Sequence, residues 1–102
     1  MVITLVDGSI KTTDAMRTFV HQRLAAALGR FEERIRRVEV RITDENGPRG
    51  GVDKLCRVTA TIAGAGPLMI EKRASDFYEA IARATNAVKQ NVVRRVSKRG
   101  KR

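Results

Sequence analysis

The fold is decided by the stretch RVEVRITDENGPRGGVDKLCRVTATI, residues 37–62. Apolar and polar side chains alternate through residues 37–43 and again through residues 54–62. The apolar members of the two series are Val38, Val40 and Ile42, then Cys56, Val58, Ala60 and Ile62. A period of two is typical of a strand with one buried face. Residues 44–51, DENGPRGG, are rich in turn residues and longer than a tight hairpin needs, so we expect two antiparallel strands joined by an extended turn.

Two more strands are expected around this pair. VITLV, residues 2–6, is a short β-branched run that ends at an Asp-Gly turn signal. LMIEKRA, residues 68–74, follows the turn GAGP and is the third strand in a row. Leu68 and Ile70 are predicted to face the core, whereas Lys72 interrupts the apolar series.

The segment TTDAMRTFVHQRLAAALGRF, residues 12–31, has the helical period. Thr13 is the expected N-cap, and Gly29 is expected to end or loosen the helix. The predicted apolar face consists of Met16, Val20, Ala27 and Phe31, with Leu24 beside them.

The clearest helix begins at an Asp-x-x-Glu arrangement, Asp76 to Glu79, which resembles a capping box. Five apolar residues fall within about 80° of one another on a helical wheel. They are Phe77, Ile81, Ala84, Val88 and Val92. We expect this helix to run to about residue 96.

The predicted order is β-α-β-β-β-α, which is an α+β fold. The four strands form one sheet, both helices pack on one of its faces, and the layout resembles a double-stranded-RNA-binding domain. A length of 102 residues fits one compact domain. We place this domain at residues 1–96 and expect a short basic tail at residues 97–102.

Composition narrows the partners and the compartment. The net charge is +10, which points to nucleic acid or an anionic membrane as partner. No apolar run approaches the roughly 20 residues that span a bilayer, and the N-terminus carries no visible secretory signal. Cys56 is the single cysteine, which excludes an internal disulfide and fits a reducing cytosol. We therefore expect a cytoplasmic protein.

Positive charge gathers on the second helix and just beyond it. Residues 80–102 contain eight basic residues and no acidic one. Arg83 and Arg94 share one stripe of the helical wheel, away from the apolar face, and Lys89 lies on the opposite flank. Arg95 falls on the core side, which predicts that the helix has outrun its sheet by that turn.

The first helix carries a matching set, because Arg23 and Arg30 lie seven residues apart on one flank. Two helices on one face of a sheet would bring the two sets together. Ordinary solvated surfaces mix signs and gain from ion pairs, whereas here the repulsion is uncompensated. The pattern therefore predicts a polyanion-binding surface.

Among polyanions, folded RNA fits best. The apolar face of the second helix is rich in alanine and valine and is needed for the core, which disfavours a membrane-surface helix. The sequence has no RNP aromatic pair, GXXG clamp, zinc-finger spacing or helix-turn-helix pattern. Recognition is therefore expected to depend on backbone and shape rather than on base sequence.

Catalytic chemistry has little support. His21 has no second histidine or cysteine at ligand spacing, and Cys56 points inward on a strand like a small hydrophobe. The glycine-rich turns are not followed by a helix, as a phosphate-binding loop requires. We expect no enzymatic activity, no metal and no cofactor.

Three motifs carry a resemblance to a known family. DFYEAI, residues 76–81, is similar to an Asp-x-Tyr-x-Ala-Ile signature. The stretch DAMRTFVHQRLAAALGRFEERIRRVEVRI, residues 14–42, resembles a helix, a late aromatic and an alternating strand of the same family, and VVRRVSK, residues 92–98, matches its basic helix end. Over nearly its whole length the chain resembles the short ribosome hibernation promoting factors and ribosome-associated inhibitors of bacteria.

The resemblance implies a cytosolic inhibitor of translation that preserves idle ribosomes in stationary phase and under stress. It implies binding to the small ribosomal subunit and the 70S ribosome, in the channel that holds mRNA and the A-site and P-site tRNAs. The chain looks closer to the hibernation-promoting branch, which acts with a separate ribosome modulation factor. The predicted RNA-binding residues are Arg23, Arg30, Arg83, Lys89, Arg94, Arg95, Lys98 and Arg99. Tyr78 matches the signature tyrosine and is interpreted as a packing residue that joins helix and strand.

Two other function classes stay open. A general structured-RNA-binding module without ribosome specificity would bind any long RNA duplex with comparable affinity. A regulatory module for an acidic protein partner would show no dependence on RNA.

Overall fold

The computed structural model describes residues 1–45 and 51–100, and the side chains of residues 1–45 and 51–96. Residues 46–50 of the expected extended turn lie outside this range. The elements are β1 (Val2–Asp7), α1 (Asp14–Leu28), the 3-10 helix η1 (Gly29–Phe31), β2 (Ile35–Asp44), β3 (Lys54–Ile62), β4 (Gly66–Ala74) and α2 (Phe77–Gly100). This order confirms the predicted β-α-β-β-β-α arrangement.

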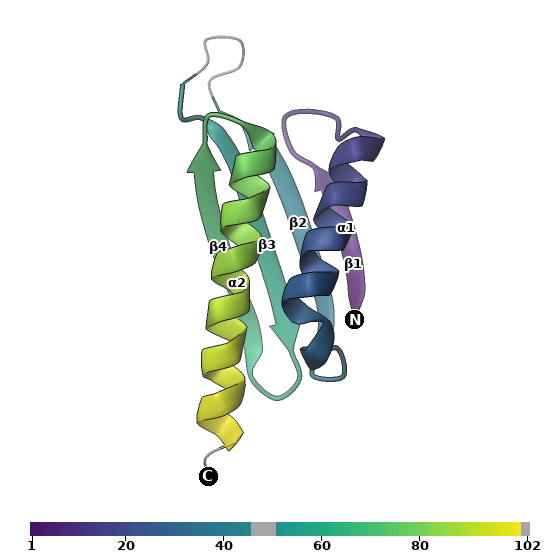
Figure 1. The fold of residues 1–102 in the computed structure, drawn as a ribbon, viewed down its shortest axis with the longest axis vertical. Coiled ribbons are helices and arrows are strands. Elements are labelled where there is room, and N and C mark those ends of the chain that lie inside the picture. The colour runs from purple at the N-terminus through teal and green to yellow at the C-terminus, as the bar shows by residue number, and fades with distance from the viewer. Residues whose placement is uncertain (46–50, 101–102) are drawn as a thin grey trace.

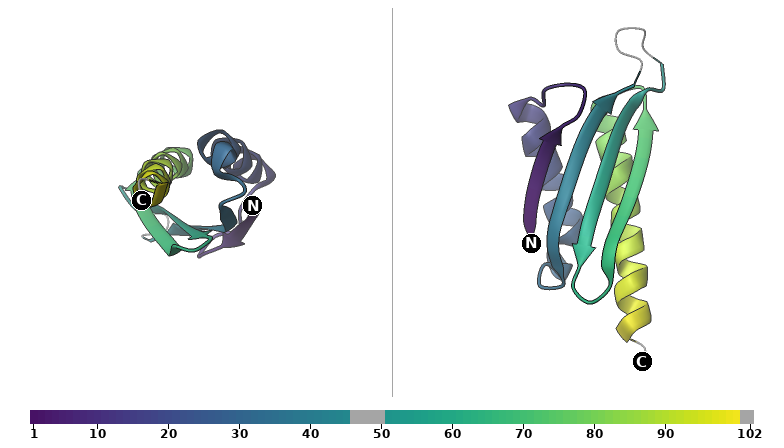
Figure 2. Two further views of the ribbon diagram at one scale, coloured as in Figure 1. Left: turned by 90° about the horizontal axis from the view of Figure 1, so that it is seen from below. Right: turned by 180° about the vertical axis from the view of Figure 1, so that it is seen from behind.

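The four strands form one mixed sheet in the order β1-β2-β3-β4. β1 pairs in parallel with β2, while β2, β3 and β4 pair antiparallel with their neighbours. Figure 1 shows α1 and α2 lying side by side in front of the sheet, and the end-on view of Figure 2 shows both on the same face. The opposite face of the sheet is left uncovered by helices, as the rear view of Figure 2 shows.

The core lies between the sheet and the two helices, and the alternation of the strands builds it. Across β2 and β3 the inward residues meet as partners, since Val40 is opposite Val58 and Ile42 is opposite Cys56. All four of these side chains are fully buried. Both predicted inward series are therefore confirmed. In β4, Leu68 is buried but Ile70 is only half-buried, because β4 is the edge strand.

α1 begins as expected, because the Thr13 hydroxyl accepts a hydrogen bond of 3.1 Å from the backbone N–H of Met16. Its buried stripe differs from the predicted one and consists of Met16, Val20, Leu24 and Leu28. These positions follow a strict i, i+4 spacing, which keeps one row of side chains on the sheet. Ala27 and Phe31 were predicted to be in this stripe but are only half-buried. Ala27 faces α2 instead and lines a groove between the helices.

α2 begins at half of the expected capping box. The backbone N–H of Glu79 donates to the Asp76 carboxylate at 3.2 Å, but the Glu79 side chain pairs with Arg83 at 2.7 Å instead of reaching back. Four members of the predicted apolar face, Ile81, Ala84, Val88 and Val92, are fully buried. α2 ends at Gly100 and not near residue 96, so its last turns extend beyond the β3–β4 turn (Figure 1). The division into a domain at residues 1–96 and a tail stays a prediction.

Candidate nucleic-acid interface

The outward side of α2 presents cations that nothing nearby neutralises. Lys89 and Arg94 are exposed, and neither makes a hydrogen bond or ion pair within the part of the chain that the structure describes. The sequence of α2 contains no carboxylate after Glu79. The field of these cations is therefore directed into solvent, where an anionic partner gains the most from it.

Arg83 is exposed but makes an ion pair and a hydrogen bond within the fold. Its guanidinium pairs with Glu79 one turn earlier and donates to the backbone carbonyl of Arg73 at 3.2 Å. Arg73 lies near the end of β4, so Arg83 ties the first turns of α2 to the sheet. Two of its five N–H donors are thus engaged within the fold.

Arg95 corrects the expectation that α2 has outrun the sheet at this turn. Its guanidinium donates to the backbone carbonyl of Ala65 at 3.2 Å and to that of Pro67 at 3.4 Å. Val96 is half-buried and packs against the core. Arg95 therefore joins α2 to the β3–β4 turn, and only the part of α2 after this residue extends past the sheet.

Arg23, predicted to bind RNA, lies between the two helices. Its Nε donates to the Thr85 hydroxyl at 3.2 Å, and one terminal nitrogen donates to the Ala82 carbonyl at 3.0 Å. The Thr85 hydroxyl is itself anchored, since it contacts the Ile81 carbonyl at 2.9 Å. Arg23 thus holds α1 and α2 at a fixed separation, and its remaining terminal nitrogen is left to face solvent or a ligand.

Arg30 is fully in reach of a partner. It lies in η1, its side chain is exposed, and its guanidinium carbon lies 4.8 Å from the ring centroid of Phe31. Stacking on an aromatic ring orients a guanidinium without consuming its donors. The structure therefore leaves the donors of Arg30 available to a partner at the end of α1.

The side chains of Lys98 and Arg99 lie outside the described residues. Their backbone belongs to α2, which continues through Gly100. The contacts predicted for these two residues stay predictions.

Three cations of the sheet make ion pairs with acidic side chains. Arg57 pairs with Glu71 at 2.7 Å, and Arg73 pairs with Glu45 through two hydrogen bonds of 2.7 and 3.0 Å. The Arg73 guanidinium lowers the pKa of the Glu45 carboxyl below its usual value. Lys54 likewise pairs with Asp53 at 2.9 Å. Acidic partners thus neutralise Lys54, Arg57 and Arg73, whereas Arg37 of the sheet, like Lys89 and Arg94 of α2, is exposed without an ion pair among the described residues.

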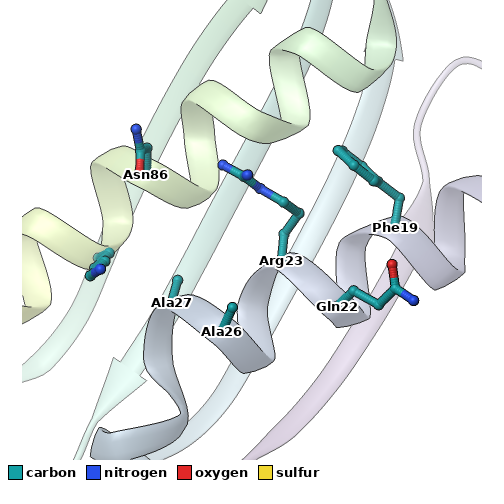
Figure 3. Close-up of a pocket in the computed structure, with 7 residues that line it drawn as sticks. Phe19, Gln22, Arg23, Ala26, Ala27 and Asn86 are labelled. Carbon is teal, nitrogen blue, oxygen red and sulfur yellow. The ribbon is translucent and has the colours of Figure 1, made fainter.

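A groove of about 250 Å³ lies between α1 and α2 (Figure 3). Its lining from α1 consists of Phe19, Gln22, Arg23, Ala26 and Ala27. Its lining from α2 consists of Asn86 and Lys89. We call this feature the interhelix groove. It places an apolar floor beside exposed amide and ammonium groups, a combination that sequence reasoning missed because its parts come from two distant segments.

Tyr78 packs beside this groove. Its ring meets that of Phe19 edge to face, with centroids 5.2 Å apart and an interplanar angle of 73°. The tyrosine thus joins helix to helix, and not helix to strand as expected. Arg23 lies with its guanidinium carbon 6.0 Å from the Phe19 centroid. Phe19 therefore contacts both a second aromatic ring and a cation.

Other reactive groups are placed as the sequence predicts. Cys56 is fully buried, and burial raises the pKa of its thiol to about 12, so it stays protonated and inert at neutral pH. His21 is exposed on α1.

Within residues 1–45 and 51–100, no group of three or more histidine, cysteine or carboxylate side chains is arranged to hold a metal ion. Over the same residues, no helix is both long and apolar enough to span a bilayer.

Comparison with known proteins identifies a family and two similar structures. The model of the family described as sigma 54 modulation protein / S30EA ribosomal protein matches residues 3–100. The N-terminal domain of Thermus thermophilus Protein Y is similar with a TM-score of 0.75 and 24% identity, covering 92% of this chain and 98% of that one. A ribosomal subunit interface protein from Coxiella burnetii is similar with a TM-score of 0.80 and 11% identity, covering 95% and 99%. At these identities the two structures establish the fold. No curated protein sequence matches the chain.

Proposed function

The chain belongs to the sigma 54 modulation protein / S30EA ribosomal protein family, and from this premise we propose that it binds the small ribosomal subunit through its helical face and inhibits translation there. Members of this family associate with the ribosome, so the ribosome is the partner. The proposal adds the surface, the subunit and the consequence. The protein would act in the cytoplasm on idle ribosomes, alone or beside a separate ribosome modulation factor.

One observation carries the proposal: Lys89 and Arg94 are exposed and unneutralised on a helix without carboxylates after its first turn. Ribosomal RNA offers a dense array of phosphates, and each phosphate that a cation neutralises releases counterions. On the opposite face Arg57 and Arg73 are already paired with glutamates, which leaves Arg37 as an exposed arginine without an ion pair among the described residues. The helical face is therefore the side that an RNA surface would contact.

The predicted contact residues divide into two groups on this surface. Arg30, Lys89 and Arg94 are free to bind phosphate. Arg23, Arg83 and Arg95 first stabilise the fold and offer only their remaining donors. We propose that the first group supplies most of the affinity and that the second group presents the surface in a fixed shape. Lys98 and Arg99 would extend it along α2.

We propose that the molecule lies lengthwise in the channel between the head and body of the subunit. The molecule measures 49 Å along its longest axis and 22 and 19 Å across. A narrow body with one charged long side fits a cleft walled by RNA. Occupying the mRNA and tRNA channel would exclude both substrates, and this exclusion is the proposed mechanism of inhibition.

Sedimentation tests the proposal. Purified protein is centrifuged through sucrose with small subunits, 70S ribosomes or an RNA duplex, at about 100 and about 500 mM salt, since phosphate contacts weaken with salt. We expect saturation near one copy per small subunit and per 70S ribosome, and little binding to the duplex. Equal affinity for all RNAs would instead identify a general structured-RNA-binding module, and binding that survives RNA removal would identify an acidic protein partner.

A further inference from the structure

The interhelix groove is a small site with an ordered wall. Its volume of about 250 Å³ lies just below the roughly 300–1,000 Å³ of pockets that hold drug-sized ligands. An occupant of this site is therefore about as large as one flat ring system. Figure 3 shows Phe19 and Arg23 rising from α1 toward the space between the helices, with Asn86 on the α2 side.

The chemistry of the lining combines a flat apolar surface with paired amides. Phe19, Ala26 and Ala27 supply the apolar surface. Gln22 of α1 and Asn86 of α2 are exposed lining residues, and each amide offers both a hydrogen-bond donor and an acceptor. The edge of a nucleobase presents the complementary mixture of donors and acceptors, and its face stacks on an aromatic ring.

The positive charge at the rim of the groove favours a ring that belongs to a nucleic acid. Lys89 lines the groove and has no ion-pair partner among the described residues. A neutral or cationic ring would gain nothing from the Lys89 ammonium group, whereas a nucleotide brings a phosphate next to its base.

The groove is organised before any ligand arrives. Arg23 fixes the separation of the helices through Thr85 and Ala82. Tyr78 holds the Phe19 ring from one side in an edge-to-face contact. A site whose walls are held by the fold avoids the cost of ordering side chains on binding.

We propose that the interhelix groove captures one unpaired nucleotide of the ribosomal RNA, with its base against Phe19, its edge toward the amides that line the groove and its phosphate at Lys89. This inference rests on the proposed function, because it names the part of the small subunit that the helical face engages. It adds a base-stacking contact to a surface that sequence analysis interpreted as reading backbone and shape alone.

The test compares two isosteric variants. Ala26→Leu fills the groove, whereas Ala25→Leu adds the same three carbons at the neighbouring exposed position, which does not line it. Leucine has nearly the helix propensity of alanine, so both variants are expected to fold. Affinity for the small subunit is measured by sedimentation, and 2′-hydroxyl acylation maps the mobility of each ribosomal nucleotide in the complex.

The wild-type protein and Ala25→Leu are expected to protect one unpaired nucleotide that Ala26→Leu leaves reactive. Ala26→Leu is expected to bind roughly ten-fold more weakly, as loss of one stacked base predicts. Equal affinity and equal footprints for both variants would overturn the proposal while leaving the proposed function intact. Weaker binding by Ala26→Leu without a changed nucleotide would also overturn it and would indicate a protein side chain in the groove. Failure of the wild-type protein to bind the subunit would overturn both.

Discussion

At the scale of single residues, the arginines of the helical face have different tasks. Arg23 gives two hydrogen bonds to α2, while Arg30 gives none to the described part of the fold. Arg23→Met, which keeps most of the aliphatic stem, is expected to lower the free energy of unfolding by about 1–2 kcal/mol. Arg30→Met is expected to change it by less than about 0.5 kcal/mol. Urea unfolding measures both, and equal effects would contradict the bridging role of Arg23.

Gly8 is a residue that the backbone requires. Its N–H donates to the Ile42 carbonyl at 3.0 Å, and a Cβ atom there would collide with that same carbonyl and with the Thr43 hydroxyl. Gly8→Ala is therefore expected to destabilise the protein by about 1–3 kcal/mol. Gly29→Ala is the control, because nothing lies within 4 Å of a Cβ atom added at this position and the φ of Gly29 is −54°. This change is expected to stabilise by about 0.4–1 kcal/mol in thermal unfolding, and similar losses at both glycines would refute the steric argument.

The role of a residue was predictable only where it depends on residues nearby in the sequence. The Thr13 cap and the inward Cys56 follow from positions within a few residues, and both predictions are confirmed. The partners of Arg23 lie 59 and 62 residues away, and those of Arg95 lie 28 and 30 residues away. A helical wheel gives the direction of such a side chain but not the carbonyl that it meets.

At the scale of elements, a single carboxylate connects the end of β1 to the start of α1. Asp7 accepts hydrogen bonds from the backbone N–H of Thr12 at 2.9 Å and from its hydroxyl at 2.8 Å. These two bonds lower the pKa of the Asp7 carboxyl below its ordinary value of 3.8. A carboxyl with a lowered pKa stabilises the fold fully above its unfolded pKa, and this contribution is lost as the pH falls through the lowered value.

Asp7→Ala is therefore expected to be less stable than the wild-type protein at pH 7. The difference in free energy of unfolding should stay constant down to about pH 4 and shrink below it. Urea unfolding from pH 7 to pH 3 measures the difference. A difference that does not depend on pH would contradict the charged role of Asp7.

The elements themselves were predicted well because they depend on period. Alternation identified β2 and β3, and the 3.6-residue period identified α2. The errors fall where tertiary contacts decide. Leu28 took the sheet-facing position that was assigned to Ala27, since α1 follows a strict i, i+4 row onto the sheet. α2 continues four residues past its expected end at residue 96, where no glycine or proline interrupts the helix before Gly100.

At the scale of the whole molecule, the two faces differ in how their charge is balanced. On the sheet, Arg57 and Arg73 pair with glutamates while Arg37 stays unpaired among the described residues, and on the outward side of α2 both Lys89 and Arg94 are unpaired. The sequence predicted the excess charge of α2, because residues 80–102 contain no carboxylate. It did not predict the ion pairs of Arg57 and Arg73 or the interhelix groove, because the former need the register of distant strands and the latter needs the separation of two helices.

The most direct test of the central claim compares Arg94→Glu with Arg37→Glu in binding to the small ribosomal subunit. Both arginines are exposed and both changes alter the net charge equally, but Arg94 lies on the helical face and Arg37 on the opposite face of the sheet. We predict that Arg94→Glu weakens binding about ten-fold or more at about 100 mM salt and lowers the salt dependence by about one phosphate contact, while Arg37→Glu has little effect. Equal losses for the two variants would show that only net charge matters, and a larger loss for Arg37→Glu would place the ribosome on the sheet.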